Sequence, residues 1–140
     1  MRIRPASAAD LPALAAFDSV AAQDQTRTGQ IARWIADQHC WLLEEGQAPR
    51  AYLALTNSFF GRPFVEMLMV DSDLRRHGYG QKLLEHAVAA HPDLWTSTNQ
   101  SNLPMLALLA RAGFVRSGIV EGLDEGDPEL IFRHHPPLVE

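Results

Sequence analysis

The feature that most constrains this chain is an apolar stretch that runs directly into a loop rich in arginine and glycine. Residues 64–70 are mostly apolar, an acidic turn follows at Asp71-Ser72-Asp73, and the loop Arg75–Gln81 leads into a helical pattern. The start of a helix exposes unpaired backbone N–H groups and the positive end of its dipole, so it attracts anions. Glycine lets a phosphate approach the backbone, and arginine supplies forked donors suited to phosphate. The loop therefore predicts a pyrophosphate-binding site at a strand-to-helix turn.

The spacing of these residues separates the loop from two other nucleotide-binding motifs. No Gly-Lys-Ser or Gly-Lys-Thr occurs, which excludes a P-loop, and Leu83 stands where a dinucleotide-binding motif has its third glycine. The pattern Arg75-x-x-Gly78-x-Gly80 instead resembles the acetyl-CoA pyrophosphate loop of the GNAT superfamily of N-acetyltransferases. A glycine-softened turn without a ligand is the alternative interpretation of this one motif.

The composition is that of one ordinary globular domain spanning residues 1–140. Its 46% hydrophobic and 21% charged residues exclude wholesale disorder. No apolar run approaches the ~18 residues of a membrane span, and the N-terminus lacks the apolar core of a secretion signal. The single cysteine, Cys40, allows no internal disulfide, so a cytoplasmic location is expected. The net charge of −5 disfavours nucleic-acid binding and weakly favours a cationic acceptor.

Hydrophobic periodicity and breaker residues predict the element order β-α-α-β-β-β-α-β-α-β-β. Strands are expected at residues 3–6, 40–44, 51–56, 64–70, 94–98, 114–120 and 129–133. Helices are expected after a cap at Ser7 or Asp10, over 31–38, from Gln81 to before Pro92, and between a cap at Asn102 and a stop at Gly113. Segments 23–29 and 57–63 are expected to be loops, the second helping to determine which acceptor binds. This order is similar to that of a GNAT domain, which implies an α/β fold with a mixed, mostly antiparallel central sheet, a splayed strand pair and helices on both faces.

A second motif strengthens the resemblance. The segment from Asn102 to Phe114 is similar to the family's Asn-x-x-Ala-x-x-Leu-Tyr-x-x-x-Gly-Phe pattern, at the separation from the glycine loop that the family shows. The tyrosine of this pattern, which usually acts as general acid in the family, is replaced by Leu109 in this chain. The remaining candidate donors are Ser97, Thr98 and Ser101, and unassisted departure of the thiolate is the alternative.

The resemblance implies acetyl-CoA as co-substrate and assigns its contacts by position. Backbone groups of Leu68, Met69 and Val70 would hold the pantetheine arm and the thioester carbonyl. The pyrophosphate would lie in a cradle formed by Arg75, Arg76, His77, Gly78, Tyr79, Gly80 and Gln81. Asn102 would bind the end of the pantetheine or position the helix cap. No metal is expected, because His86 and His91 have the wrong spacing for one helical face.

Glu66 is the candidate general base, because an amine must lose a proton to attack a thioester near neutral pH. It lies on the expected cofactor strand, four residues before Val70 and between apolar neighbours. A solvent-facing or salt-bridged carboxylate is the alternative interpretation of this residue. Residues 121–129 form either a solvated acidic loop or a rim that attracts a cation. Candidates for lining the acceptor pocket, or for simple packing, are Trp34, Tyr52, Phe59 and Phe60.

These expectations together describe an N-acetyltransferase that moves an acetyl group from acetyl-CoA to the primary amine of a small molecule or peptide by direct attack. Two alternatives stay open, a noncatalytic acyl-CoA-binding or sensing module and an enzyme that transfers a longer acyl group. In the second alternative, Met67 and Met69 would line an adaptable channel. The amine acceptor is the expected partner, no nucleic acid or membrane is expected, and a homodimer is left open.

Overall fold

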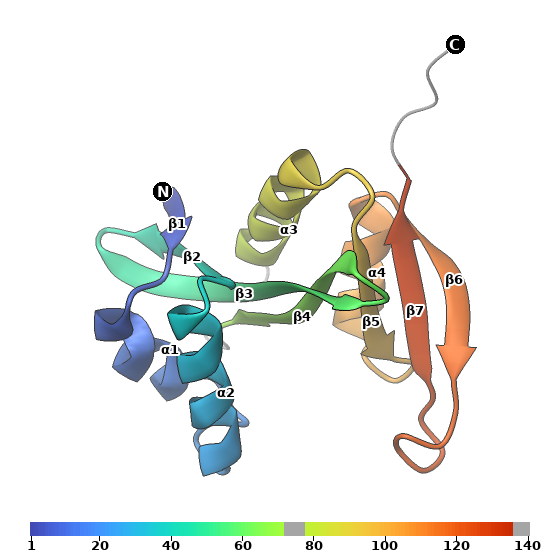
Figure 1. Cartoon of the computed structure of the whole chain (residues 1–140), viewed down its shortest axis with the longest axis horizontal. Helices are drawn as coiled ribbons and strands as arrows, with labels where there is room; N and C mark the ends of the chain where they lie inside the picture. Colours follow the sequence, from blue (N-terminus) through green and yellow to red (C-terminus); the bar gives the residue numbers. More distant parts are fainter. Residues whose placement is uncertain (72–77, 136–140) are drawn as a thin grey trace. The chain divides into compact units, whose positions relative to one another are not determined.

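A computed structural model of the chain describes residues 1–71 and 78–135 (Figure 1). The predicted order of strands and helices is confirmed, with one additional short 3₁₀ helix, η1 (Ala8–Asp10). The α-helices are α1 (Leu11–Phe17), α2 (Gln25–Ala36), α3 (Tyr79–Ala90) and α4 (Leu103–Arg111). The strands are β1 (Arg2–Pro5), β2 (Cys40–Glu45), β3 (Ala48–Phe59), β4 (Arg62–Val70), β5 (Trp95–Asn99), β6 (Phe114–Val120) and β7 (Glu129–His134).

The strands form one open mixed sheet in the order β1-β2-β3-β4-β5-β7-β6, which confirms the predicted fold class. The pairs β1–β2, β2–β3, β5–β7 and β6–β7 are antiparallel. Strands β4 and β5 are parallel and are joined by the residue pairs Phe64↔Trp95 and Val65↔Thr96. The chain divides into two units, residues 1–55 with 67–83 and residues 56–66 with 84–140.

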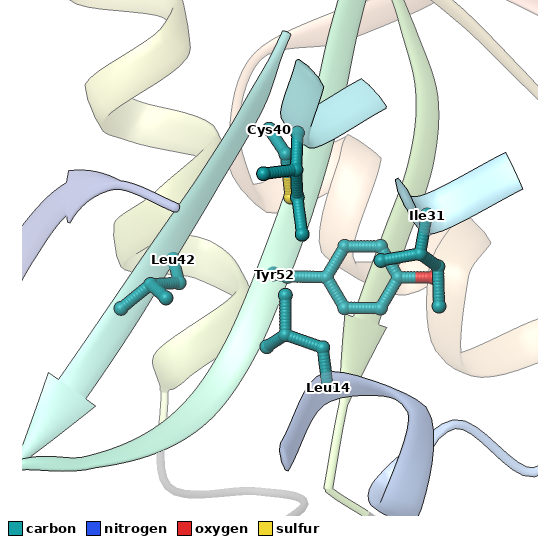
Figure 2. Close-up of a cluster of buried hydrophobic side chains, with 6 residues drawn as sticks. Leu14, Ile31, Cys40, Leu42 and Tyr52 are labelled. Atoms are coloured by element: carbon teal, nitrogen blue, oxygen red, sulfur yellow. The ribbon is translucent and has the colours of Figure 1, made fainter. Parts of the chain in front are cut away.

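The core of the first unit gathers around the ring of Tyr52, on β3 (Figure 2). The members of this Tyr52 cluster, all buried, are Leu14, Ile31, Ile35, Cys40, Leu42 and Tyr52. Residues one turn apart on a helix share a face, which is why α2 contributes two isoleucines spaced by four. Met67 and Met69, near the end of β4, pack against the same cluster. The side chains of both methionines are therefore partly buried against the core of the first unit.

Helix α2 begins earlier than the sequence pattern predicts. The pattern indicates a loop at residues 23–29 and a helix over 31–38, whereas the helix spans Gln25–Ala36. Asp24 is the reason, because its carboxylate accepts a hydrogen bond from Thr26 N at 2.9 Å and caps the first turn. Gly29 lies inside the helix, where glycine costs about 1 kcal/mol relative to alanine. The packing of Ile31 and Ile35 in the Tyr52 cluster offsets this cost.

The expected loop at residues 57–63 is instead the tip of a β-hairpin. Strand β3 continues to Phe59, and β4 already begins at Arg62. Phe60 and Gly61 form the two-residue turn, with φ angles of 53° and 75°. Positive φ at both positions matches the twist of the two strands in a tight hairpin. The sequence prediction fails here because a phenylalanine occupies a position where asparagine or glycine is usual.

The second unit contains β5, β7 and β6 side by side, and helix α4 contacts β6. Its buried side chains include Leu94, Leu109, Phe114 and Leu130. The predicted cap of α4 is confirmed, because Asn102 Oδ1 accepts a hydrogen bond from Met105 N at 3.3 Å. The predicted stop is also confirmed, because Gly113 follows the helix with a φ of 88°.

Candidate active site

The predicted anion site lies at the start of α3. Arg75, Arg76 and His77 lie outside the described residues. Gly78 has a φ of 80°, and among the described residues no heavy atom lies within 4 Å of the position that a Cβ would take. Its carbonyl accepts a hydrogen bond from Lys82 N at 3.0 Å, so it leads directly into the first turn of α3. This open glycine backbone at the start of a 12-residue helix fits the approach of a phosphate.

The hydroxyl of Tyr79 is bonded to a carboxylate, which directs attention to the backbone of this residue in the anion site. The residue is 6% exposed, and its hydroxyl donates a hydrogen bond to Glu45 Oε1 at 3.3 Å. Burial, together with the neighbouring Glu45, raises the pKa of Tyr79. Gly80 is buried and Gln81 is half-buried in the same helical turn. The pyrophosphate contacts of these three residues remain a prediction that concerns backbone N–H groups above all.

The expected cofactor strand ends at Val70, and its last residues have their side chains partly covered. Leu68, Met69 and Val70 are all half-buried. The next residue, Asp71, donates its N–H to the carbonyl of Arg50 on β3 at 3.0 Å, so the strand is held just past its end. Backbone contacts of Leu68, Met69 and Val70 with a pantetheine arm remain a prediction.

Glu66, the candidate base, lies on β4 in a polar rather than an apolar environment. Its Oε1 accepts a hydrogen bond from Thr56 Oγ1 at 2.8 Å and a very short one from Ser58 Oγ. The two hydroxyl oxygens are themselves 2.8 Å apart. The expectation of apolar surroundings is therefore wrong, because β3 continues past Thr56 and brings both hydroxyls to the carboxylate. Two donors on one oxygen hold the carboxylate in place.

Sequence reasoning did not find Thr56 and Ser58 as partners of the base. The signal for them is present in the chain, because polar residues at alternate positions of a strand share one face. Because residues 57–63 are expected to form a loop, the sequence analysis does not apply this alternation to Ser58.

The side chains considered as proton donors are largely committed to other contacts. Ser97 Oγ donates to Glu129 Oε2, and Ser101 Oγ donates to Asp127 Oδ2, both at 2.6 Å. Thr98 is 7% exposed, and Leu109 is completely buried. Either serine would have to give up a carboxylate partner before it could protonate a thiolate. Ser97 and Ser101 are therefore poor candidates for the general acid.

The acidic loop between β6 and β7 is attached to the end of β5. Asn99 Nδ2 donates to Asp124 Oδ2 at 2.9 Å and to the carbonyl of Asp127 at 3.2 Å. Ser101 N donates to Asp127 Oδ1 at 3.0 Å. These bonds give Asp124 and Asp127 a structural role, whereas Glu121 and Glu125 are exposed. Attraction of a cationic acceptor by this loop remains a prediction.

A buried carboxylate in the first unit is absent from the sequence expectations. Asp18, just after α1, is completely buried, and its Oδ1 accepts the N–H groups of Val20 and Ala21 at 2.9 and 3.1 Å. Its Oδ2 accepts Tyr52 Oη at 2.6 Å and Arg27 Nη1 at 3.2 Å. Burial favours the neutral acid, but these donors outweigh it and lower the pKa of Asp18. Asp18 is therefore a charged, fully bonded group inside the core.

This arrangement decides the role of Tyr52. Burial first, and then the bond to Asp18, raise the pKa of Tyr52, so its phenol is a poor acid. Arg27 extends the cluster toward β4, since its Nη1 lies 3.7 Å from Met67 Sδ. Of the two interpretations of Tyr52, packing is the one that the structure supports.

The other aromatic candidates contact neighbouring rings. The ring centroid of Trp34 lies 6.5 Å from that of Tyr52 in the first unit. In the second unit the ring of Phe59 lies between those of Phe60 and Phe64, with centroids 5.0 Å away in each case. Phe60 is 89% exposed, so it contributes little to the core.

Within residues 1–71 and 78–135, no group of three His, Cys, Asp or Glu side chains is placed to hold a metal ion. No helix in this part of the chain is long and apolar enough to cross a membrane.

Similarity to known proteins agrees with this geometry. The Acetyltransferase (GNAT) family model matches residues 9–114. A GNAT-family acetyltransferase from Bacillus cereus ATCC 10987, solved by crystallography, superposes with a TM-score of 0.90 at 32% identity and 98% coverage of both chains. The peptidyl-lysine N-acetyltransferase YjaB of Escherichia coli K12 is 27% identical over 116 residues, 81% of this chain and 76% of YjaB. A Bacillus anthracis str. Ames protein solved in complex with acetyl coenzyme A shares the fold, with a TM-score of 0.61, 18% identity and coverage of 69% of this chain and 61% of that one.

Proposed function

Because the chain belongs to the GNAT family of acetyltransferases, we propose that it moves the acetyl group of acetyl-CoA to a primary amine, a peptide lysine being the first acceptor to examine. The lysine acceptor is suggested by the name of YjaB, which is 27% identical to this chain. The use of acetyl-CoA is supported by the bound acetyl-CoA in the Bacillus anthracis structure of the same fold. A small-molecule amine is the alternative acceptor.

The observation that carries this proposal is the carboxylate of Glu66, which lies on the expected cofactor strand β4 and is held by two hydroxyls from β3. Thr56 and Ser58 fix one oxygen, Oε1, so the position of the whole carboxylate is defined before an acceptor arrives. A base positioned in advance loses little freedom when the amine binds, and this lowers the barrier to proton transfer.

The reaction has three parts. Glu66 takes a proton from the acceptor, directly or through one water, and leaves a neutral amine with its lone pair exposed. The amine nitrogen forms a bond to the thioester carbonyl carbon, while backbone N–H groups near the end of β4 stabilise the negative oxygen. The carbon–sulfur bond then breaks, the sulfur leaves as a thiolate, and the new amide nitrogen loses its second proton to the thiolate or to water. A thiol has an ordinary pKa of about 8.5, so this anion leaves without a strong acid beside it.

A thiol-release assay with acetyl-CoA and a set of amines tests this proposal. The set contains a lysine peptide, the same peptide with acetylated lysine, and small amines. Glu66→Gln keeps the size of the side chain and removes its basicity, so kcat/KM is expected to fall by about 10²-fold. Asp37→Asn, at an exposed carboxylate just after α2, is the control for the same loss of charge and is expected to keep wild-type turnover.

Two results would contradict the proposal. Acetyl-CoA binding by calorimetry without thiol release for any amine would indicate a sensing module instead of an enzyme. Equal turnover of Glu66→Gln and Asp37→Asn would show that water or the acceptor itself handles the proton.

A further inference from the structure

Thr96, on β5, makes a buried hydrogen bond to the strand that carries Glu66. Its Oγ1 donates to the carbonyl of Val65 at 3.0 Å, and the residue is 1% exposed. Val65 is itself 2% exposed, so water has little access to this bond. A buried hydroxyl that bonds a backbone carbonyl on another strand restrains that strand locally.

This hydrogen bond lies where few backbone hydrogen bonds join β4 to β5. The described pairing of β4 with β5 consists of Phe64↔Trp95 and Val65↔Thr96, so Thr96 acts at the end of a very short ladder. Parallel pairing is slightly less stable per residue than antiparallel pairing, and a two-pair ladder restrains its last residue weakly. The hydroxyl adds a side-chain restraint where the backbone ladder ends.

The bond also acts directly on the residue next to it. The carbonyl of Val65 and the N–H of Glu66 belong to one planar peptide unit, which rotates as a whole. A bond that fixes the direction of the Val65 carbonyl therefore fixes the direction in which the backbone enters Glu66. Thr56 and Ser58 hold the other end of the same residue, at its carboxylate.

We infer that Thr96 is a positioning residue for Glu66: its hydroxyl fixes the Val65–Glu66 peptide and so sets where the base stands. This inference rests on the base role of Glu66 in the proposed function. A displacement of about 1 Å in a catalytic group can reduce turnover by up to about 10²-fold, so the loss of one restraint should be measurable. Thr96 acts through Glu66 and does not contact the reacting atoms.

Thr96→Val removes the hydroxyl at nearly constant volume, and Thr96→Ser keeps it. In steady-state thiol release, Thr96→Val is expected to lower kcat about tenfold with less than about a threefold change in the KM for acetyl-CoA. Thr96→Ser is expected to return kcat to within about threefold of wild type. A purely structural role would not produce this selective loss of kcat with rescue by serine.

The decisive measurement is the double variant Thr96→Val with Glu66→Gln. If Thr96 acts through the base, this double variant turns over as slowly as Glu66→Gln alone, within about threefold. Losses that multiply would overturn the inference, as would wild-type kcat in a folded Thr96→Val. If Thr96→Val does not fold, Thr96→Cys and Thr96→Ser give the same comparison, because they differ little in size but strongly in donor strength.

The same set of variants separates the two proposals. If Glu66→Gln is slow and Thr96→Val is fast, only the positioning role fails. If Glu66→Gln is as fast as wild type, the base role fails and the positioning role fails with it.

Discussion

Replacing Tyr52 with phenylalanine isolates one hydrogen bond to a carboxylate that is completely buried. Tyr52 Oη donates to Asp18 Oδ2 at 2.6 Å, inside the core of the first unit. Phenylalanine keeps the ring in contact with the Tyr52 cluster and removes only the hydroxyl. The variant therefore measures the bond and leaves most of the packing intact.

The size of the effect follows from what Asp18 keeps. Its Oδ2 still accepts Arg27 Nη1 at 3.2 Å, and its Oδ1 still accepts two backbone N–H groups. Because the carboxylate keeps these partners, the free energy of unfolding should fall by the contribution of one hydrogen bond to a charged group, about 1.5–3 kcal/mol. For a chain of 140 residues this corresponds to a decrease in Tm of about 5–10 °C.

The effect should depend on pH in a defined direction. The pKa of Asp18 is lowered in the folded protein, so its charge stabilises the fold above the unfolded-state pKa of about 3.9. This stabilisation is lost as the pH falls through the lower folded pKa. Tyr52→Phe removes a donor and moves that folded pKa up toward its ordinary value. The difference between wild type and variant should therefore be constant above about pH 5 and should narrow below about pH 4.

Urea unfolding followed by tryptophan fluorescence at several pH values measures this difference, provided that the m-values agree. Tyr79→Phe is the matched control, since its hydroxyl makes a longer bond, 3.3 Å, to the exposed Glu45. A smaller loss of stability is expected there. Equal losses in the two variants would refute the reasoning, and a difference that does not change at acid pH would show that the charge of Asp18 is not involved.

Three further results are expected. Gly78→Glu should weaken acetyl-CoA binding, measured by calorimetry, at least about tenfold and more than Gly78→Ala does. Both substitutions strain a backbone with a φ of 80°, but only glutamate adds a negative charge. Equal affinities of the two variants would argue against an anion site. Leu109→Tyr should lower the free energy of unfolding by about 1–3 kcal/mol, because a phenol ring must enter a completely buried position. Unchanged stability with faster turnover would instead place Leu109 beside the reacting sulfur. Ser97→Ala should change kcat by less than about threefold, because Ser97 Oγ donates its proton to Glu129; a large drop in kcat would identify this serine as the acid.

The parts of the fold that the sequence predicts well are those with a local chemical signal. Asn102 caps α4 and Gly113 ends it because an amide side chain and a residue with positive φ are needed at those points. The start of α2 carries a signal too, but Asp24 is followed by polar residues and Gly29, and apolar periodicity appears only from Ile31. Phe60 gives the opposite of the usual signal, since a bulky residue takes the left-handed conformation of the turn.

In the candidate site, too, residues with a local signal can be predicted from the sequence, and contacts between distant residues are harder to predict. Glu66 can be proposed from its place in one strand, and the anion loop can be proposed from its glycines. Alternation places Thr56 and Ser58 on one face of their strand, but it does not show that this face meets Glu66, since Ser58 lies eight residues away. Thr96 carries no such signal, because it acts through a carbonyl 31 residues away. The pairing of Asp18 with Tyr52 spans 34 residues, and no pattern within a single helix or strand encodes it. Such contacts depend on strand register and helix placement, which emerge only from the packed structure.

The burial of Cys40 makes this chain convenient to study with thiol reagents. Cys40 is 1% exposed, and burial, with Asp10 nearby, raises the pKa of its thiol to about 12. Disulfide reagents attack the thiolate, so the folded protein should add almost no background to an assay that counts released coenzyme thiol. Because Cys40 is the one cysteine of the chain and lies in the Tyr52 cluster, its slow labelling reports the opening of that core. The rate of labelling in each variant then gives a measure of local stability that is independent of urea, obtained with the reagent that already measures turnover.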